Sequence, residues 1–250
     1  MAGVKTKFMK ELTRLNKYIA SMTGYSRREA DKLIEEGKVS VNGKRVKEQG
    51  VKIDETEDVV FINNEPIYES KPDVFKFYKP RRVLTAYGEG RGKDTLEKFP
   101  IFAGRKFPYS GRLDYESEGL LIFSNDGELI QRMQKPEYKM EKEYLVTVDR
   151  LLSSVEMEEF ASGLDTPKGK YQPCNIKFAG KYNYKVIIKE GKKRQIRNMF
   201  GYFGSKVKRL ERVRIGPILI GNLKPGEYEM LSRDEIIKLY KATGLNYNTK

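Results

Sequence analysis

The stretch Gly111-Arg112-Leu113-Asp114-Tyr115-Glu116-Ser117-Glu118-Gly119-Leu120-Leu121 is the part of the chain from which its fold and chemistry can be worked out. It begins with polar residues that carry one arginine and one carboxylate, which is typical of a loop. The apolar run from Leu120 to Phe123 predicts a buried strand, and Asn125-Asp126-Gly127 predicts a turn. Catalytic side chains often lie on loops that a rigid strand holds. Asp114 is therefore the first candidate for a catalytic residue.

The composition restricts the partner. The chain has 250 residues, with 49 Lys plus Arg against 35 Asp plus Glu, and its formal net charge is +14. Such a charge favours a polyanion, above all nucleic acid. No apolar run approaches the roughly 20 residues of a membrane span, and the N-terminus lacks the apolar region of a signal peptide. We therefore expect a nucleic-acid partner and no membrane association.

Cysteine and histidine usage restricts the chemistry. Cys174 is the only cysteine, which excludes an intrachain disulfide and a cysteine cluster for zinc, and a reducing, cytoplasmic location is expected. The chain contains no histidine, which excludes imidazole as a base or a metal ligand. Any catalysis must use carboxylate, tyrosine, lysine or arginine, and no metal site is expected.

Residues 1–62 predict a small basic unit with two helices and a hairpin. Apolar residues at helical spacing predict the first helix, and they are Phe8, Met9, Leu12, Leu15 and Ile19. A second helix is predicted to begin at the capping box Ser26-Arg27-Arg28-Glu29 and to end at Gly37. Asn42-Gly43, between two short valine-containing runs, predicts a hairpin with a type I′ turn, and residues 58–62 can add a strand.

A different pattern begins after residue 73. Residues 63–73 contain Asn-Asn and two prolines without a sustained period, so they are the predicted linker. Short β-branched or aromatic runs at 74–78, 144–148 and 184–188 predict strands. Capping boxes at Ser153 and Ser232 predict helices between and after them. Strands mixed irregularly with helices predict an α+β domain over residues 74–250.

The order of motifs resembles that of the RNA pseudouridine synthases, specifically the branch formed by the A type for small-subunit ribosomal RNA and the B, E and F types for large-subunit ribosomal RNA. The motifs are Lys79-Pro80-Arg81, the run around Asp114, Glu143-Tyr144-Leu145-Val146, Arg194-Gln195-Ile196-Arg197 and Gly226-Glu227-Tyr228. The chain looks closest to the F and B types. The N-terminal unit resembles the alpha-L RNA-binding domain of the ribosomal protein S-four type. The resemblance implies a mixed, mainly antiparallel sheet in the catalytic domain.

This resemblance also implies a reaction, the isomerisation of a uridine in ribosomal RNA to pseudouridine. The 23S RNA is favoured as substrate, and a transfer RNA is a second candidate. The bond from ribose C1′ to N1 breaks, the uracil turns, and C5 joins C1′, so no cofactor is needed. Bond cleavage develops positive charge on the sugar, which a carboxylate can stabilise or capture. Asp114 is assigned this role, and attack at C1′ and a glycal-like route both remain open.

Four further residues are assigned to the site. Ile196, Met199, Phe200 and Phe203 recur at helical spacing and predict a buried helix face, so that Arg197 lies on another face. By resemblance, Arg197 would pair with Asp114, and Tyr144 would stack on the uracil. Arg112 would help to displace the nucleotide from its stack. Leu223 is a candidate apolar wall for the base.

Basic residues along the chain are candidates for RNA binding. Residues 181–214 contain twelve Lys or Arg against two Glu, interleaved with Tyr182, Tyr184, Phe200, Tyr202 and Phe203. This mixture is expected where phosphates are neutralised and unpaired bases are stacked. The candidate residues are Arg14, Lys17, Arg27, Arg28, Lys44, Lys193, Arg194, Lys208 and Arg209.

Two other functions compete with this interpretation. A non-catalytic RNA-binding ribosome-assembly factor would bind RNA without needing Asp114. A carboxylate-pair glycosidase or nucleosidase is suggested by Asp114, Glu116 and Glu118, which would share one face of an extended segment. Asn198 departs from the family pattern, in which many relatives carry a second arginine at this position. The absence of a coiled-coil pattern makes a monomer the expected state.

Overall fold

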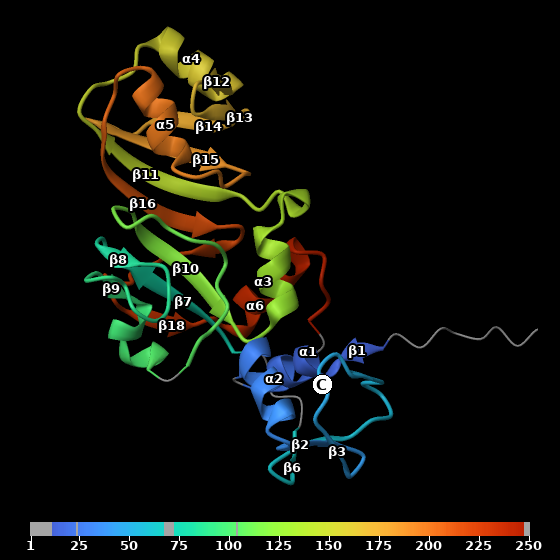
Figure 1. Ribbon diagram of the computed structural model, residues 1–250. Helices are drawn as coiled ribbons and strands as arrows, with labels where there is room; N and C mark the ends of the chain where they lie inside the picture. The colour runs from blue at the N-terminus through green and yellow to red at the C-terminus, as the bar shows by residue number, and fades with distance from the viewer. Residues whose placement is uncertain (1–11, 24, 68–72, 104, 248–250) are drawn as a thin grey trace, which may run out of the picture. The chain divides into compact units, whose positions relative to one another are not determined.

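The computed structural model describes residues 12–23, 25–67, 73–103 and 105–247. The chain falls into two compact units, one of Met1–Pro72 with Arg105–Phe107 and one of Asp73–Gly104 with Pro108–Lys250. Their elements are labelled in Figure 1. The domain bounds 1–62, 63–73 and 74–250 remain predictions, and linker residues 68–72 lie outside the described part of the chain. No helix among the described residues is both long and apolar enough to cross a membrane.

The first unit combines two helices with two small antiparallel sheets. Its elements are β1 (Thr13–Arg14), α1 (Leu15–Met22), α2 (Arg27–Glu35), β2 (Val39–Val41), β3 (Lys44–Val46), β4 (Lys52–Ile53), β5 (Val60–Ile62) and β6 (Glu65–Pro66). One sheet has the order β3-β2-β5-β6, and β1 pairs with β4 in the other. Leu15, Ile19, Ala30, Ile34 and Val39 are at most 1% exposed and form the core between helices and strands.

Local sequence signals hold well in this unit. The Ser26 hydroxyl accepts a hydrogen bond from the Glu29 N–H, and the Glu29 carboxylate accepts one from the Ser26 N–H, so the predicted capping box is confirmed. Asn42 and Gly43 have φ values of 51° and 78°, as a type I′ turn between β2 and β3 requires.

The first helix is shorter than its apolar spacing predicts. It begins at Leu15, and Leu12 lies before it with half of its surface exposed. The reason is that Thr13–Arg14 pairs with β4 instead of continuing the helix. The predicted helical positions Phe8 and Met9 lie outside the described residues.

The second unit is built on an eight-stranded sheet. Its strands and helices are β7 (Val74–Lys79), β8 (Val83–Leu84), β9 (Asp94–Thr95), η1 (Leu96–Lys98), η2 (Pro100–Phe102), β10 (Glu118–Ser124), α3 (Gly127–Gln134), η3 (Pro136–Tyr138), β11 (Lys142–Val148), α4 (Ser154–Ser162), β12 (Leu164–Thr166), β13 (Gly169–Tyr171), β14 (Asn175–Phe178), β15 (Asn183–Ile188), α5 (Gln195–Tyr202), β16 (Val207–Ile215), β17 (Ile218–Leu219), β18 (Tyr228–Met230) and α6 (Arg233–Ala242).

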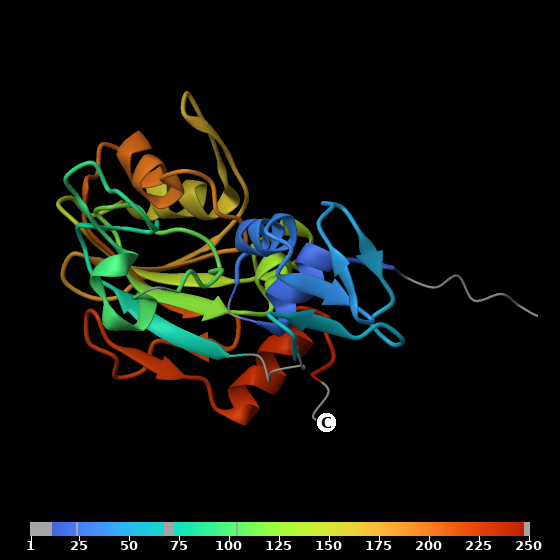
Figure 2. The same cartoon turned by 60° about the horizontal axis from the view of Figure 1, so that its bottom comes forward.

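The strand order in this sheet is β14-β15-β11-β16-β10-β7-β18, with β17 paired to β16. Figure 2 shows β18 (red) at the edge beside β7 (teal). The pairing of β10 with β16 is parallel, and the other pairings in the sheet are antiparallel. The predicted mixed, mainly antiparallel α+β domain is therefore confirmed.

Both faces of β7 and β10 are buried. Leu120 and Ile122 pack on one face against Leu129 of α3 and Leu239 of α6, the two helices that lie beside these strands in Figure 1. The opposite face is aromatic and includes Phe123, whose ring lies 4.8 Å from that of Phe102. Because both faces are covered, all seven residues of β10 are buried.

The predicted turn at Asn125-Asp126-Gly127 is instead the start of helix α3. The Asp126 carboxylate accepts hydrogen bonds from the N–H groups of Glu128 and Leu129 and so caps the helix. Leu129 and Met133 then bury the same face of α3. An Asp-Gly pair fits a hairpin turn and a helix N-terminus equally well, and the apolar spacing after it decides between them.

The remaining helices cover one face at the β15 end of the sheet. Phe200 of α5 packs on Tyr184 of β15 at 5.4 Å between ring centroids and on Phe160 of α4 at 4.8 Å. The predicted capping boxes that begin α4 at Ser153 and α6 at Ser232 are confirmed.

Gly119 sets the distance between β10 and β16. Its φ is +107°, and a Cβ built on it would lie 2.3 Å from the Arg212 carbonyl oxygen and 2.6 Å from the Arg212 nitrogen. Those atoms are backbone and cannot move aside without displacing β16. Only glycine therefore permits the observed pairing.

Replacing Gly119 with alanine should destabilise the protein by about 3 kcal/mol or more, because overpacking and an unfavourable φ act together. Urea unfolding of the variant measures this loss. Gly127→Ala is the matched control, because its Cβ meets nothing within 4 Å and it lies in the first turn of α3, so the change should stay within about 1 kcal/mol. Equal losses in the two variants would contradict the close approach at Gly119.

Lys142 of β11 is a buried cation and is 8% exposed. Burial lowers its pKa to about 8, and the charge of Arg212 acts in the same direction. Its ammonium group donates a hydrogen bond to the Met140 carbonyl oxygen.

This shift predicts a pH dependence of stability. The native amine loses its proton near pH 8, whereas the same group in the unfolded chain does so near 10.5. Between these values the unfolded state binds more protons, so the free energy of unfolding rises with pH. Lys142→Met should remove up to about 1 kcal/mol per pH unit of that rise between pH 8 and 10. Urea unfolding across this range measures the slope, and equal slopes in both proteins would contradict the effect of burial.

Candidate active site

The loop that carries Asp114 is held from one side by Thr85. The Thr85 hydroxyl donates to the Leu113 carbonyl oxygen at 2.9 Å and accepts from the Leu113 N–H at 3.1 Å. The Leu113 side chain is buried beneath the loop. The residue before Asp114 is therefore fixed through both its backbone and its side chain.

The other side of Asp114 is held by a turn. The Ser117 N–H donates to the Asp114 carbonyl oxygen at 3.0 Å, and the Arg82 N–H donates to the Tyr115 carbonyl oxygen at 2.7 Å. Asp114 itself is half-buried. A carboxylate fixed on both sides can face a reacting group without the entropy loss of ordering a free loop.

This turn also decides the geometry of the acidic triplet. Because the chain turns after Asp114, the extended segment on which three acids share one face does not form. Glu116 instead pairs with Arg81 at 2.9 Å, and Glu118 lies in β10, where it pairs with Arg209. The carboxylate arrangement that suggested a glycosidase is therefore absent from the loop.

Arg197 of α5 contacts the same loop from another element. Its Nη2 donates to the Glu116 carbonyl oxygen at 2.9 Å and to the Ser117 hydroxyl at 3.4 Å, and its Nη1 donates to the Val207 carbonyl oxygen at 2.9 Å. Among the described residues, its Nε is buried without a hydrogen-bond partner.

The charge of Asp114 also acts on Arg197. Burial and the nearby charge of Arg194 lower the pKa of the Arg197 guanidinium, and the negative charge of Asp114 opposes that shift. The two groups thus interact electrostatically, while the hydrogen bonds of Arg197 go to the loop backbone. Direct pairing of the guanidinium with the Asp114 carboxylate stays a prediction.

Tyr144 lies on the face of the sheet that α5 covers. In register across the sheet, Lys79 of β7 pairs with Gly119, Gly119 with Arg212, and Arg212 with Tyr144. Paired residues on neighbouring strands point to the same face. Tyr184, two residues along β15 from the partner of Tyr144, packs on α5. Tyr144 and Arg197 therefore lie on one face of the sheet.

Lys79 connects Asp114 to the same face. It is fully buried and donates to the carbonyl oxygens of Pro80 at 2.7 Å and Val83 at 2.8 Å. Burial lowers its pKa to about 8, and the negative charges of Glu118 and Asp114 oppose the shift. The charge of Asp114 therefore acts on Lys79, the first residue of this row. Tyr144, the last residue of the row, lies three strand spacings of about 4.8 Å from Lys79.

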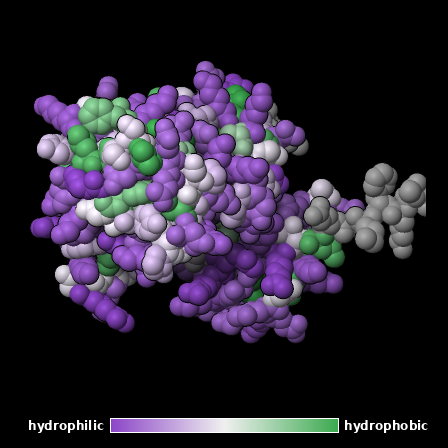
Figure 3. All heavy atoms as spheres, turned by 90° about the horizontal axis from the view of Figure 1, so that it is seen from above, coloured by the Kyte–Doolittle hydropathy of each residue, from purple (hydrophilic) through white to green (hydrophobic). Residues whose placement is uncertain are grey.

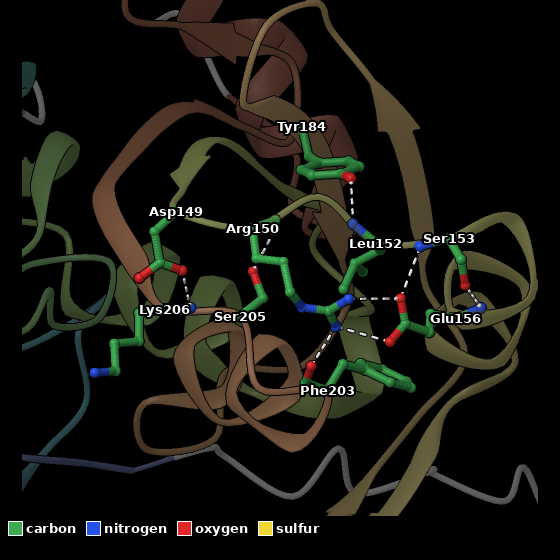
Figure 4. A network of polar contacts seen from close by, with 9 residues as sticks. All are labelled: Asp149, Arg150, Leu152, Ser153, Glu156, Tyr184, Phe203, Ser205 and Lys206. Carbon is green, nitrogen blue, oxygen red and sulfur yellow. Dashed lines mark hydrogen bonds and ion pairs between the residues drawn. The ribbon is translucent and has the colours of Figure 1, made fainter.

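Helix α5 is anchored at its C-terminal end by the polar network in Figure 4. The Arg150 guanidinium pairs with Glu156 at 2.7 Å and also donates to the Phe203 carbonyl oxygen, and the Ser205 hydroxyl donates to the Arg150 carbonyl oxygen at 2.7 Å. The Asp149 carboxylate accepts from the Lys206 N–H at 2.7 Å. These contacts join the segment after Arg197 to the loop that follows the strand of Tyr144.

Several predicted site residues are not drawn into this cluster. Arg112 is exposed next to it in sequence, and Leu223 is half-buried in the loop between β17 and β18. Arg194 is the residue before α5, in a left-handed conformation with φ 54°. Lys208 is exposed and pairs with Asp149 at 3.4 Å. Asn198, the departure from the family pattern, donates to the Tyr171 hydroxyl at 2.9 Å.

The RNA-binding candidates divide into exposed and buried groups. Exposed cations include Arg14, Lys17, Arg27, Arg28, Lys44 and Lys193. Tyr182 and Tyr202 are half exposed, but Tyr184 and Phe200 belong to the core between β15 and α5. Including those two among base-stacking residues was wrong, because alternate strand positions and one helix face turn inward.

The sequence did not identify three residues that build the site. Lys79 lies within a quoted motif and Arg212 within the basic stretch 181–214, but neither was given a role, since a buried cation cannot be recognised by periodicity. Thr85 carries no local signal at all, because its partner Leu113 is distant in sequence.

The Thr85 contact can be tested directly. Thr85→Val removes both hydrogen bonds to Leu113 and should lower the free energy of unfolding by about 1–3 kcal/mol. It should also speed hydrogen exchange of the Leu113 amide, which exchange measured by NMR would show. Thr85→Ser keeps the hydroxyl and should retain most of the protection. Unchanged exchange in the valine variant would mean that Thr85 does not hold the loop.

Comparison with known proteins identifies the two parts of the chain. Residues 73–202 match the family model described as RNA pseudouridylate synthase, and residues 13–60 match the S4 domain. A solved structure titled as a pseudouridylate synthase is similar, with a TM-score of 0.63 and 31% identity, covering 90% of this chain and 99% of its own.

Curated relatives extend over most of the chain. An uncharacterized RNA pseudouridine synthase of Aquifex aeolicus is 38% identical over 94% of this chain and 96% of its own length. The dual-specificity RNA pseudouridine synthase RluF of Salmonella typhi is 35% identical over 92% and 79%. The ribosomal large subunit pseudouridine synthase B of Bacillus subtilis is 32% identical over 91% and 96%. The chain therefore belongs to the RNA pseudouridine synthase family and is an RNA pseudouridine synthase whose catalytic domain follows an S4 domain.

Proposed function

We propose that this synthase isomerises a specific uridine of ribosomal RNA, with the 23S RNA favoured and a transfer RNA as a second substrate. The names of two relatives support this, one as an enzyme of the large ribosomal subunit, the other as a dual-specificity enzyme. The net charge of +14 suits a polyanion. The face drawn in Figure 3 is mostly hydrophilic, with apolar residues in small groups, which also suits a charged partner.

One observation carries the site assignment. The loop of Asp114 is held by the hydrogen bonds of Thr85 to Leu113, and Arg197 donates a hydrogen bond to the backbone of the same loop. Asp114 would act on ribose C1′ while the bond to N1 breaks, where positive charge develops on the sugar. Arg197 would balance the charge of the carboxylate and hold its loop in place while water is excluded. In one route Asp114 would attack C1′, and in the glycal-like route another group would remove the C2′ proton while Asp114 stabilises the charge on the sugar.

Base recognition would use residues around that carboxylate. Tyr144 would stack on the flipped uracil, a contact worth about 1–3 kcal/mol per base, which offsets much of the unstacking. Arg112, exposed beside Asp114, would displace the nucleotide, and Leu223 would form an apolar wall.

The S4 domain would bind structured RNA. Its candidate contacts are the exposed residues Arg14, Lys17, Arg27, Arg28 and Lys44, joined in the catalytic domain by Lys193, Arg194 and Lys208. Binding through these cations should weaken steeply with salt. We place the domain bounds at 1–62 and 74–250 and expect a cytoplasmic monomer.

Tritium release tests the chemistry and the residue together. Ribosomal RNA labelled at uracil C5 must lose its label when C5 joins C1′, so the native protein should release tritium. Asp114→Asn keeps the shape but removes the charge, and it should reduce release by at least about 10²–10³-fold. RNA binding should be unchanged, because the substitution is isosteric.

Glu116→Gln is the matched control, because this neighbouring carboxylate pairs with the exposed Arg81. It should retain most of the release. Tritium release by neither protein from the RNA of both ribosomal subunits or from transfer RNA, with equal binding, would favour the assembly factor. Free uracil among the products would favour a glycosidase.

A further inference from the structure

The candidate site has two parts, Asp114 on one side and Tyr144 with Arg197 on the other. Between them lies the pairing of β10 with β16, which is the shortest among the central strands of the catalytic sheet. β10 and β16 pair only through Glu118 with Glu211 and Gly119 with Arg212. By contrast, β10 pairs with β7 over six residues and β11 with β16 over seven. We call this two-residue pairing the seam. Asp114 precedes β10 on one side of the seam, and Tyr144 and Arg197 belong to elements on the other.

A cluster of side chains crosses the seam. The Arg209 guanidinium pairs through Nε with the Glu118 carboxylate and through Nη2 with the Glu211 carboxylate at 3.1 Å. The Tyr78 hydroxyl donates to the Glu211 carboxylate at 2.9 Å. Burial and this hydrogen bond raise the pKa of Tyr78, which keeps it a donor.

The chemistry of the cluster explains why it holds the strands in place. Glu118 and Glu211 stand directly opposite each other, and their side chains are 9% and 14% exposed. Two facing carboxylates in that environment repel each other unless a cation lies between them. Arg209 contacts both, so a change in the spacing or register of the seam would separate charges that are partly shielded from water.

The cluster lies on the face of the sheet opposite the site. Side chains alternate along a strand, and Arg212 shares the face of Tyr144. Glu211 and Arg209, one and three residues before Arg212, therefore point to the other face. Arg209 pairs in register with Thr147, which is three residues from Tyr144 and so also points to the face opposite Tyr144. From there, Arg209 cannot touch the uracil or the sugar.

We propose that Arg209, with Glu118 and Glu211, is a positioning cluster that sets the placement of Asp114 relative to Tyr144 and Arg197. This inference rests on the proposed function, since it presumes that these three residues form the active site. It gives Arg209 a role different from the phosphate contact that its sequence position predicted. The Nε and Nη2 atoms of Arg209 form ion pairs with two carboxylates, while about half of its side-chain surface remains exposed.

The test compares Arg209→Ala and Glu118→Gln with the native protein in single-turnover tritium release at saturating enzyme. Each variant should slow the chemical step by about 10- to 100-fold, because small displacements of catalytic groups have effects of this size. The dissociation constant for RNA and its salt dependence should stay unchanged. The double variant should be no slower than the slower single variant, because Arg209→Ala already removes the ion pair that Glu118→Gln breaks. Arg209→Lys should restore part of the rate.

Lys98→Ala is the control for loss of an exposed cation, since Lys98 pairs with Asp94 on the surface of the same unit. It should leave rate and binding unchanged. Weaker RNA binding with a shallower salt dependence and a normal rate for Arg209→Ala would overturn the proposal in favour of a phosphate contact. A lowered melting temperature with a normal rate for the folded fraction would reduce the cluster to a structural role. If the native protein itself releases no tritium, the proposed function fails instead.

Discussion

The close approach of β10 and β16 at Gly119 is the constraint on which the catalytic domain depends. Backbone atoms of Arg212 occupy the space where any other residue would place its Cβ. Through this contact, the strand that follows Asp114 joins the strand that lies beside Tyr144. The pairing is only two residues long, so backbone hydrogen bonds alone give it little resistance to shear. Side chains supply the rest of the connection.

Arginines make most of these connections, and each uses a different geometry. Arg212 is 2% exposed and donates from Nε to the Leu120 carbonyl oxygen at 2.8 Å. Arg197 donates to the loop after Asp114. Arg209 pairs with two carboxylates on the opposite face. A planar guanidinium can donate to several acceptors at once without losing its charge, which makes arginine suited to joining elements around a site.

Buried positive charge is the second consequence of this arrangement. Lys79, Lys142 and Arg212 are each under a tenth exposed on the central strands. Burial lowers the pKa of both lysines to about 8, and Arg212 acts in the same direction on each. The desolvation of these groups is unfavourable for folding. Of these cations, Lys79 is affected by the negative charge of Asp114, which opposes the lowering of its pKa.

Short-range sequence patterns were enough to predict the local features of this protein, and the order of its motifs was enough to predict its family. Capping boxes at Ser26, Ser153 and Ser232 and the Asn42-Gly43 turn could be recognised because each depends on a few adjacent residues. The tertiary structure alone decided that Thr85 holds Leu113, that Tyr184 and Phe200 are core, and that Arg209 faces away from Tyr144. These depend on register and on contacts between residues far apart in the chain. Periodicity reports which face a residue shares with its neighbours in sequence, and it carries no information about which distant strand lies opposite.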